Sequence, residues 1–183
     1  MRIISGKFKG RKLKPPSNYE IRPTLDSVKE SIFNVIGSRI SRANVLDLFA
    51  GSGSLGIESL SRGCNMVYFV DRNYKSVKLI ECNIKGLKIS GEKYKIIKSD
   101  VIEFLKFYKG PGWDIIFMDP PYKIKSDIMI KIFNAVSKKN IAKSNTLVIY
   151  ECFLKRDIEE EIRGLDLLKK SGRGDKKILY LSP

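Results

Sequence analysis

The feature that most constrains the fold lies between Val45 and Gly56, where an apolar run containing Asp47 leads into a glycine-rich turn. A helical pattern of apolar residues follows immediately, at Leu55, Ile57 and Leu60. A buried strand that passes through such a turn into a helix is typical of the ligand-binding edge of a doubly wound sheet. Gly51 and Gly53 can adopt positive φ and let a ligand approach the backbone closely.

Strand and helix patterns alternate along the rest of the chain, which predicts an α/β fold with a mostly parallel sheet. Strands are predicted at 44–48, 66–70, 94–98, 113–118 and 146–150, and helices at 54–62, 73–87, 101–108 and 126–139. An amphipathic helix with Thr24 as its N-cap precedes the first strand. The tail predicts a short helix near 155–163 and strands near 165–169 and 177–181. No linker divides the chain, so we expect a single domain over residues 1–183.

The composition indicates a basic protein with an anionic partner. The chain has 35 Lys and Arg against 20 Asp and Glu, so its formal net charge is +15. This surplus favours nucleic acid as the partner, although a lysine-rich proteome is an alternative cause. No apolar run approaches about 18 residues, and the amino terminus lacks the apolar core of a secretory signal. We therefore expect a cytoplasmic protein with no membrane partner.

The chain contains no histidine, and its three cysteines, Cys64, Cys82 and Cys152, lack C-x-x-C spacing. This excludes Ser-His and Cys-His catalysis and gives no support for a metal site or a disulfide framework. We expect buried structural thiols, no metal, and chemistry carried by carboxylates, amides, hydroxyls or a bound reagent.

Residues 1–16 carry basic side chains and no acid, and residues 1–22 form a basic amino-terminal extension. Glycines at positions 6 and 10 between apolar residues favour a short hairpin that ends at Pro15-Pro16. A solvated flexible arm is one interpretation, and contact with nucleic-acid phosphates is the other. The candidate contacts are Arg2, Lys7, Lys9, Arg11, Lys12 and Arg22.

Ligands of an open α/β sheet bind beyond the carboxyl ends of its strands, so the residues that follow each predicted strand are candidates for a site. Those positions are occupied by Asp47 with the glycine turn, Asp71-Arg72, Asp100-Val101, Asp119 and Glu151. A single acid there is often only a helix N-cap. Successive strands that each end in an acid suggest a ligand with ribose hydroxyls and amino groups but no pyrophosphate.

The sequence Asp119-Pro120-Pro121-Tyr122 is the most specific element. Two prolines fix φ and remove two amide donors, so the carbonyl groups project from a rigid turn. An exocyclic aromatic amine could donate to the Asp119 carboxylate and the Pro120 carbonyl, while Tyr122 offers a flat face to a base. A plain turn that ends a strand is the structural alternative.

The pairing of Asp47-Leu48-Phe49-Ala50-Gly51-Ser52-Gly53 with Asp119-Pro120-Pro121-Tyr122 resembles the S-adenosylmethionine-dependent amino-methyltransferases. Arg2-Ile3-Ile4-Ser5-Gly6 and Arg22-Pro23-Thr24 resemble, more narrowly, the bacterial family that methylates the N2 amine of a guanine in small-subunit ribosomal RNA. The resemblance implies a Rossmann-like methyltransferase fold with a seven-stranded sheet whose last strand is antiparallel. It also implies S-adenosylmethionine as cofactor, and ribosomal RNA or a small-subunit assembly intermediate as partner of a monomeric enzyme.

The same resemblance implies roles for individual residues. Asp47, Phe49, Ala50 and the Gly51–Gly53 loop would hold the methionine end of the cofactor. The ribose and adenine would contact Asp71, Arg72, Asp100 and Val101. The guanine amine would be held by Asp119 and Pro120, the base would stack on Tyr122, and Thr24 and Pro121 would contribute to the RNA site.

Three alternatives remain open at this stage. A DNA methyltransferase acting on adenine N6 or cytosine N4 would use the same amine contacts, and an RNA-binding assembly factor could retain a vestigial cofactor pocket. The pattern Gly51-x-Gly53-x-x-Gly56 with Asp71 also matches a dinucleotide-binding fingerprint. That NAD-dependent alternative leaves Asp119-Pro120-Pro121-Tyr122 unexplained and has no evident proton-transfer residue.

Overall fold

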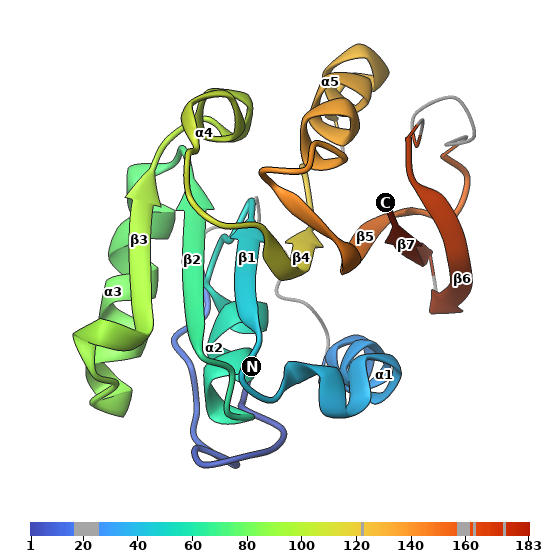
Figure 1. Cartoon of the computed structure of the whole chain (residues 1–183). Coiled ribbons are helices and arrows are strands. Elements are labelled where there is room, and N and C mark those ends of the chain that lie inside the picture. Colours follow the sequence, from blue (N-terminus) through green and yellow to red (C-terminus); the bar gives the residue numbers. More distant parts are fainter. Residues whose placement is uncertain (17–25, 122, 157–161, 163, 174) are drawn as a thin grey trace.

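The structure is a computed structural model that describes residues 1–16, 26–121, 123–156, 162, 164–173 and 175–183. A seven-stranded sheet with strand order β3-β2-β1-β4-β5-β7-β6 forms its centre (Figure 1). The strands are β1 (Asn44–Leu48), β2 (Met66–Asp71), β3 (Tyr94–Lys98), β4 (Trp113–Met118), β5 (Ala142–Phe153), β6 (Asp166–Arg173) and β7 (Lys176–Ser182). The helices are α1 (Asp26–Ile36), η1 (Gly37–Ile40), α2 (Ser54–Ser61), α3 (Tyr74–Leu87), η2 (Gly91–Lys93), α4 (Val101–Phe107) and α5 (Ser126–Val136).

The first five strands are parallel to one another, and β7 runs antiparallel to both of its neighbours, β5 and β6. The prediction of a mostly parallel seven-stranded α/β sheet is therefore confirmed. In register, Leu48 lies between Val70 and Met118. The carboxyl ends of β2, β1 and β4 consequently lie level, and the segments that follow them meet at one edge of the sheet.

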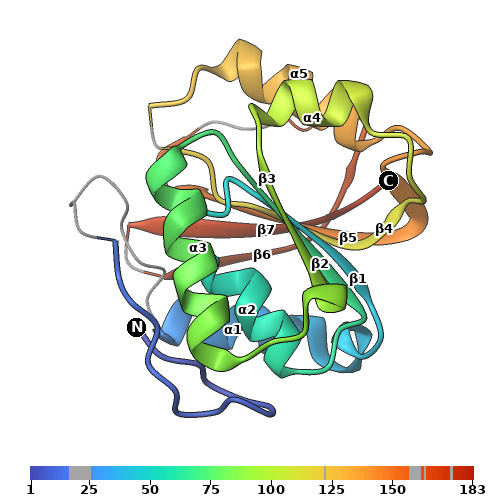
Figure 2. The same cartoon turned by 90° about the vertical axis from the view of Figure 1, so that its left-hand side faces the viewer.

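Helices cover both faces of the sheet, and each face has its own apolar core. Helices α1, α2 and α3 lie on one face, and α4 and α5 lie on the other (Figure 2). Alternation along β1 sends Val45 into the first core and Leu46 and Leu48 into the second. Because both faces are buried, β1 has no polar face, which accounts for its nearly continuous apolar sequence.

The predicted elements match the structure closely up to α5, but the last third of the chain differs. Strand β5 begins at Ala142 and ends at Phe153, so the expectation that Glu151 follows this strand is wrong and Glu151 lies inside it. Its end is extended because residues 151–153 pair with residues 176–178 of β7. Helix α5 ends at Val136, three residues before its predicted end at 139. The helix predicted near 155–163 falls largely outside the described residues.

The predicted amino-terminal hairpin is present and is docked on α2 rather than free. Arg2 and Lys12 form an antiparallel bridge. The amide of Lys7 donates to the carbonyl of Ser61 at 2.8 Å. Gly6 has φ +82° and passes so close to α2 that an added Cβ would lie 1.9 Å from that carbonyl oxygen. This close contact fixes the position of the hairpin against the helix that follows the glycine turn.

Replacing Gly56 with alanine should destabilise the fold. A Cβ on this α2 residue would lie 2.2 Å from Cε1 of Phe69 and 2.8 Å from Cγ1 of Val67, both on the sheet. We expect the free energy of unfolding in urea to fall by about 1–3 kcal/mol. Gly86→Ala is the control, because nothing lies within 4 Å of its added Cβ. It should stabilise helix α3 by up to about 1 kcal/mol, and equal effects of the two variants would contradict the packing argument.

Candidate active site

The turn that follows β1 is a tight loop built on left-handed residues. Phe49, Gly51 and Gly53 have φ of 60°, 54° and 75°. The amide of Gly53 donates to the carbonyl of Ala50 at 2.7 Å, and the amide of Gly51 donates to Oδ2 of Asp71 at 2.8 Å. The positive φ expected of the two glycines is confirmed. The left-handed Phe49 was not predicted, since a bulky residue rarely adopts this conformation.

Asp47 lies beneath this loop and is 3% exposed. Its Oδ2 accepts a hydrogen bond of 3.0 Å from the amide of Gly56 in the first turn of α2. Burial raises the pKa of Asp47 well above its usual range; the hydrogen bond from Gly56 opposes this shift, and the nearby charges of Asp119 and Asp71 add to it. The electrostatic influence of these two acids agrees with the register that brings them to the same edge.

Asp71, the last residue of β2, and Asp100, which follows β3, each organise the turn in which they lie. Oδ1 of Asp71 accepts from the amide of Asn73 at 2.8 Å, and Asn73 in turn caps α3. Asp100 caps α4 through a 2.9 Å bond from the amide of Ile102 to its Oδ1. The N-cap interpretation is therefore correct for Asp100. Its carboxylate remains exposed, as does Arg72, so both could still reach a ligand.

Asp119 directly follows β4 and is partly buried. Burial raises the pKa of Asp119 to about 7; the neighbouring Glu151 carboxylate adds to this shift, and the ammonium group of Lys176 opposes it. No hydrogen bond to the Asp119 carboxylate is formed by the described part of the chain. A carboxylate with these properties can accept a donor from a ligand.

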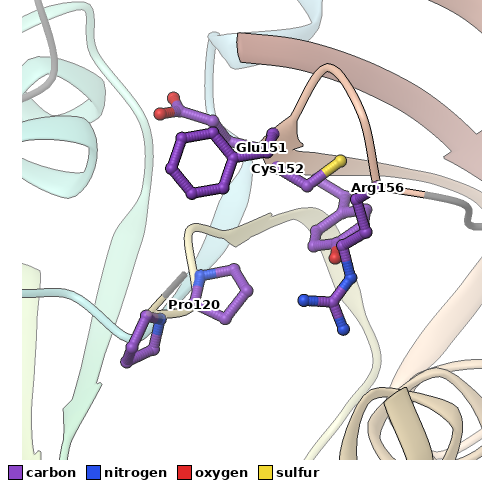
Figure 3. Close-up of a pocket in the computed structure, with 7 residues that line it drawn as sticks. Pro120, Glu151, Cys152 and Arg156 are labelled. Carbon is purple, nitrogen blue, oxygen red and sulfur yellow. The ribbon is translucent and has the colours of Figure 1, made fainter. Parts of the chain in front are cut away.

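Pro120 and Pro121 border a small pocket that is open to solvent, together with Tyr150, Glu151, Cys152, Phe153 and Arg156. Figure 3 shows the Glu151 carboxylate pointing to the opposite side of β5 from the Cys152 sulfur, with Arg156 across from Pro120. The Arg156 guanidinium donates to the carbonyl of Ile124 at 3.0 Å. This bond joins the segment after β4 to the segment after β5.

The structure brings together most, but not all, of the predicted site residues. Asp47, the 49–53 loop, Asp71, Asp100-Val101 and Asp119–Pro121 lie at one edge of the sheet. Arg22, Thr24 and Tyr122 lie outside the described residues. On the hairpin, Lys7, Lys9, Arg11, Lys12 and Lys14 are exposed. Arg2 is exposed too and forms an ion pair with Asp26, at 3.4 Å from Nε to Oδ2.

Sequence reasoning missed two residues that hold parts of the candidate site in place. Lys176 in β7 forms a buried ion pair with Glu151, which its position in a basic tail did not indicate. Asn83 of α3 bonds the backbone of the hairpin at Lys14 and the carbonyl of Ser52 in the glycine turn. A polar residue at a buried position of the α3 periodicity was the signal available for Asn83. No local signal existed for Lys176.

The donor and acceptor set at this edge fits a sulfonium nucleoside better than a dinucleotide. The Gly51 amide, which would face a pyrophosphate, is already bonded to Asp71, and buried Asp47 lies below it. That amide is therefore not free to donate to a phosphate. Ribose hydroxyls and a cationic amino acid end would instead meet carboxylate acceptors.

Among the described residues, no group of three or more His, Cys, Asp or Glu side chains could hold a metal ion. No helix among those residues is both long and apolar enough to span a membrane.

Comparison with known proteins places this architecture among methyltransferases. The profile of the family described as conserved hypothetical protein 95 matches residues 1–182. A Bacillus subtilis protein assigned as an rRNA methyltransferase, YlbH, is 35% identical over 176 residues, which cover 95% of this chain and 94% of the relative. Ribosomal RNA small subunit methyltransferase D of Haemophilus influenzae is 36% identical over 152 residues, which cover 82% of this chain and 78% of the relative.

A solved Escherichia coli structure assigned as a methyltransferase, yhhF, has the same fold throughout. Its TM-score is 0.86 at 26% identity, and the match covers 100% of this chain and 97% of the other.

Proposed function

The chain belongs to the family described as conserved hypothetical protein 95, and from this membership we propose that it is an S-adenosylmethionine-dependent methyltransferase of ribosomal RNA. The proposed target is the exocyclic N2 amine of a guanine in the small-subunit RNA. Support comes from the relative named ribosomal RNA small subunit methyltransferase D, which is 36% identical. The single structural observation that carries the proposal is the partly buried Asp119, followed by Pro120 and Pro121, level with the glycine turn.

The chain's own residues would hold the cofactor in two places. The left-handed loop of Phe49, Gly51 and Gly53 would leave room for the amino acid end over buried Asp47. Asp71 would accept from the ribose hydroxyls, since each of its oxygens has a lone pair beyond the amide bond it accepts. Arg72, Asp100 and Val101 would border the adenine. When bound, S-adenosylmethionine supplies a methyl group that its sulfonium has already activated.

The protein's part in the reaction would be to align the amine. The Asp119 carboxylate and the Pro120 carbonyl would each accept one amine N–H, which turns the nitrogen lone pair toward the methyl group. The nitrogen becomes acidic only as the new N–C bond forms, so Asp119 can accept its proton then without being a strong base. Tyr122 would stack on the target base, which must leave its own stack to enter the site.

The test is transfer of labelled methyl from S-adenosylmethionine to small ribosomal subunits from cells that lack this protein. The labelled nucleoside is then identified by mass. Label in N2-methylguanosine is the expected result. Label in another nucleoside would overturn the target, and no label with retained cofactor binding would overturn the RNA methyltransferase proposal. DNA would then be the next substrate tested.

The rate of methyl transfer should rise with pH through about 7. The pKa of Asp119 is raised to about 7, and its ionised form is the stronger acceptor of the amine N–H and the form that can take up its proton. Because kcat/KM reports the free enzyme, its pH profile should show a rising limb with a midpoint near pH 7. A profile that is flat from pH 5.5 to pH 8.5 (about one and a half units either side of that midpoint) would contradict this role for Asp119.

Neutralising the hairpin should weaken RNA binding and its salt dependence. In the triple variant Lys7→Gln, Lys9→Gln and Lys12→Gln, three exposed cations are lost. We expect the slope of log K against log salt to become shallower by about 2, at roughly 0.7 per phosphate contact. The control removes exposed Lys131, Lys138 and Lys139 in and beyond α5. Equal slopes for the two triple variants would contradict a contact between the hairpin lysines and RNA phosphates.

A further inference from the structure

Glu151 is a second buried acid beside Asp119, on the neighbouring strand. Met118 of β4 pairs with Tyr150 of β5, so Asp119 and Glu151 occupy the next level of two parallel strands. Neighbouring strands lie about 5 Å apart, which sets the spacing of the two backbones here. Phe117 and Ile149, two residues earlier on each strand, both face the core under α1. By alternation, the two carboxylates project on that same side, in agreement with their electrostatic coupling.

The two carboxylate oxygens of Glu151 differ in their bonding partners. Glu151 is 3% exposed, and its Oε1 forms an ion pair with the ammonium group of Lys176. Its Oε2 is also buried, and no donor in the described part of the chain reaches it. A buried carboxylate oxygen without a donor costs free energy, and a donor brought by a ligand would recover it. Paired with the ammonium group of Lys176, the Glu151 carboxylate offers acceptors and no donor.

A pair of adjacent acceptors distinguishes the amines of the bases. In guanine the N2 amine lies next to N1–H, so this edge presents two neighbouring donors. The N6 amine of adenine and the N4 amine of cytosine lie next to unprotonated ring nitrogens, N1 and N3, which are acceptors. A carboxylate held beside Asp119 would bond the first arrangement and repel the other two.

We propose that Glu151, held by Lys176, is a specificity-determining residue that accepts the N1–H of the target guanine while Asp119 accepts from its N2 amine. This inference rests on the proposed function and supplies it with a physical basis for guanine over adenine and cytosine. Lys176 acts as a positioning residue.

The test compares two synthetic RNAs that span the labelled guanosine, one unmodified and one with 2-aminopurine at that position. Both carry the 2-amine, but 2-aminopurine has no N1–H. The protein should methylate the guanosine RNA about 10- to 100-fold faster in kcat/KM, as expected for one hydrogen bond to a charged group. In the double variant Glu151→Met and Lys176→Met, this ratio should fall to about 1–3, since the N1–H has lost its partner.

Replacing both members of the ion pair avoids leaving one buried charge alone, so the double variant should fold. Its affinity for S-adenosylhomocysteine, measured by calorimetry, should stay within about twofold of the parent value. A ratio near 1 in the parent protein, or an unchanged ratio in the double variant, would overturn the role of Glu151 while leaving the proposed function intact. Absence of methylation on both RNAs by the parent protein would overturn both proposals.

Discussion

Replacing Asp119 with alanine should abolish methyl transfer while leaving cofactor affinity unchanged. This carboxylate follows β4, is partly exposed and receives no hydrogen bond from the described part of the chain. Without it the amine is not oriented, so kcat/KM should fall by about 100-fold or more. The cofactor-binding loop after β1 keeps its bonds to Asp71 and Ala50, so affinity for S-adenosylhomocysteine should change by less than about threefold.

The same substitution should stabilise the folded protein at pH 8. The pKa of Asp119 in the folded state is about 7, against 3.8 for an unperturbed Asp carboxyl group. Between these values the folded state keeps a proton that the unfolded state has released, so this residue makes stability fall as pH rises from about 4 to about 7. The Asp119→Ala variant does not have this loss of stability with rising pH. Its melting temperature should therefore exceed that of the parent protein at pH 8 but not at pH 4.

Asp127→Ala is the matched control, since this exposed acid lies in the first turn of α5 and has no role in the proposed site. It should change neither turnover nor the pH dependence of melting. Near-full turnover of Asp119→Ala would rule out the proposed hydrogen bond from the target amine to Asp119. Loss of turnover together with loss of cofactor binding would place Asp119 in the cofactor site instead.

Replacing Glu58 with alanine should cost about 3–5 kcal/mol of unfolding free energy. Glu58 and Lys29 are both 0% exposed, with 3.5 Å between Oε2 and Nζ. Glu58 also accepts from the amides of Ile4 and Ser5 at 2.9 and 3.0 Å, and from Arg62 Nε at 2.9 Å. Its removal leaves a buried ammonium, whose pKa burial already lowers, and two hairpin amides without their acceptor.

The measurement is urea unfolding, with hydrogen exchange reporting on the hairpin amides of Ile4 and Ser5, which should lose protection. Glu81→Ala is the control: its ion pair with Lys78 is exposed, at 2.8 Å, and should contribute less than about 1 kcal/mol. If Glu58→Ala cost no more than Glu81→Ala, the buried network would not be what holds the hairpin on α2.

Glu58 matters beyond stability because it connects the two parts of the proposed site. The hairpin carries the exposed cations, and α2 begins at the glycine turn. Lys29 donates to the carbonyl of Arg2 at 2.6 Å and to Oγ of Ser54 at 3.3 Å. Its ammonium group therefore bonds both the hairpin and the first residue of α2. In the proposed function, this rigid docking would give bound RNA a fixed position relative to the loop that would hold the cofactor.

Local sequence determined much of this protein. The order of strands and helices followed from apolar periodicity, because one-sided burial of helices and full burial of central strands leave different patterns. The positive φ of Gly51 and Gly53 followed from their residue type, since most other residues avoid this conformation. Asp47, Asp71 and Asp119 could be selected as site residues because parallel strands bring their carboxyl ends to one edge.

Other features depended on tertiary structure alone. Glu151 was expected after β5, but pairing with β7 extends the strand through it and places Lys176 beside it. The hairpin was equally compatible with a free arm until Glu58, Lys29 and Asn83 were seen to hold its backbone. Each of these contacts joins segments 25 or more residues apart. Local periodicity reports which face of an element is buried, whereas the partner of a buried charge is set by strand register and helix docking.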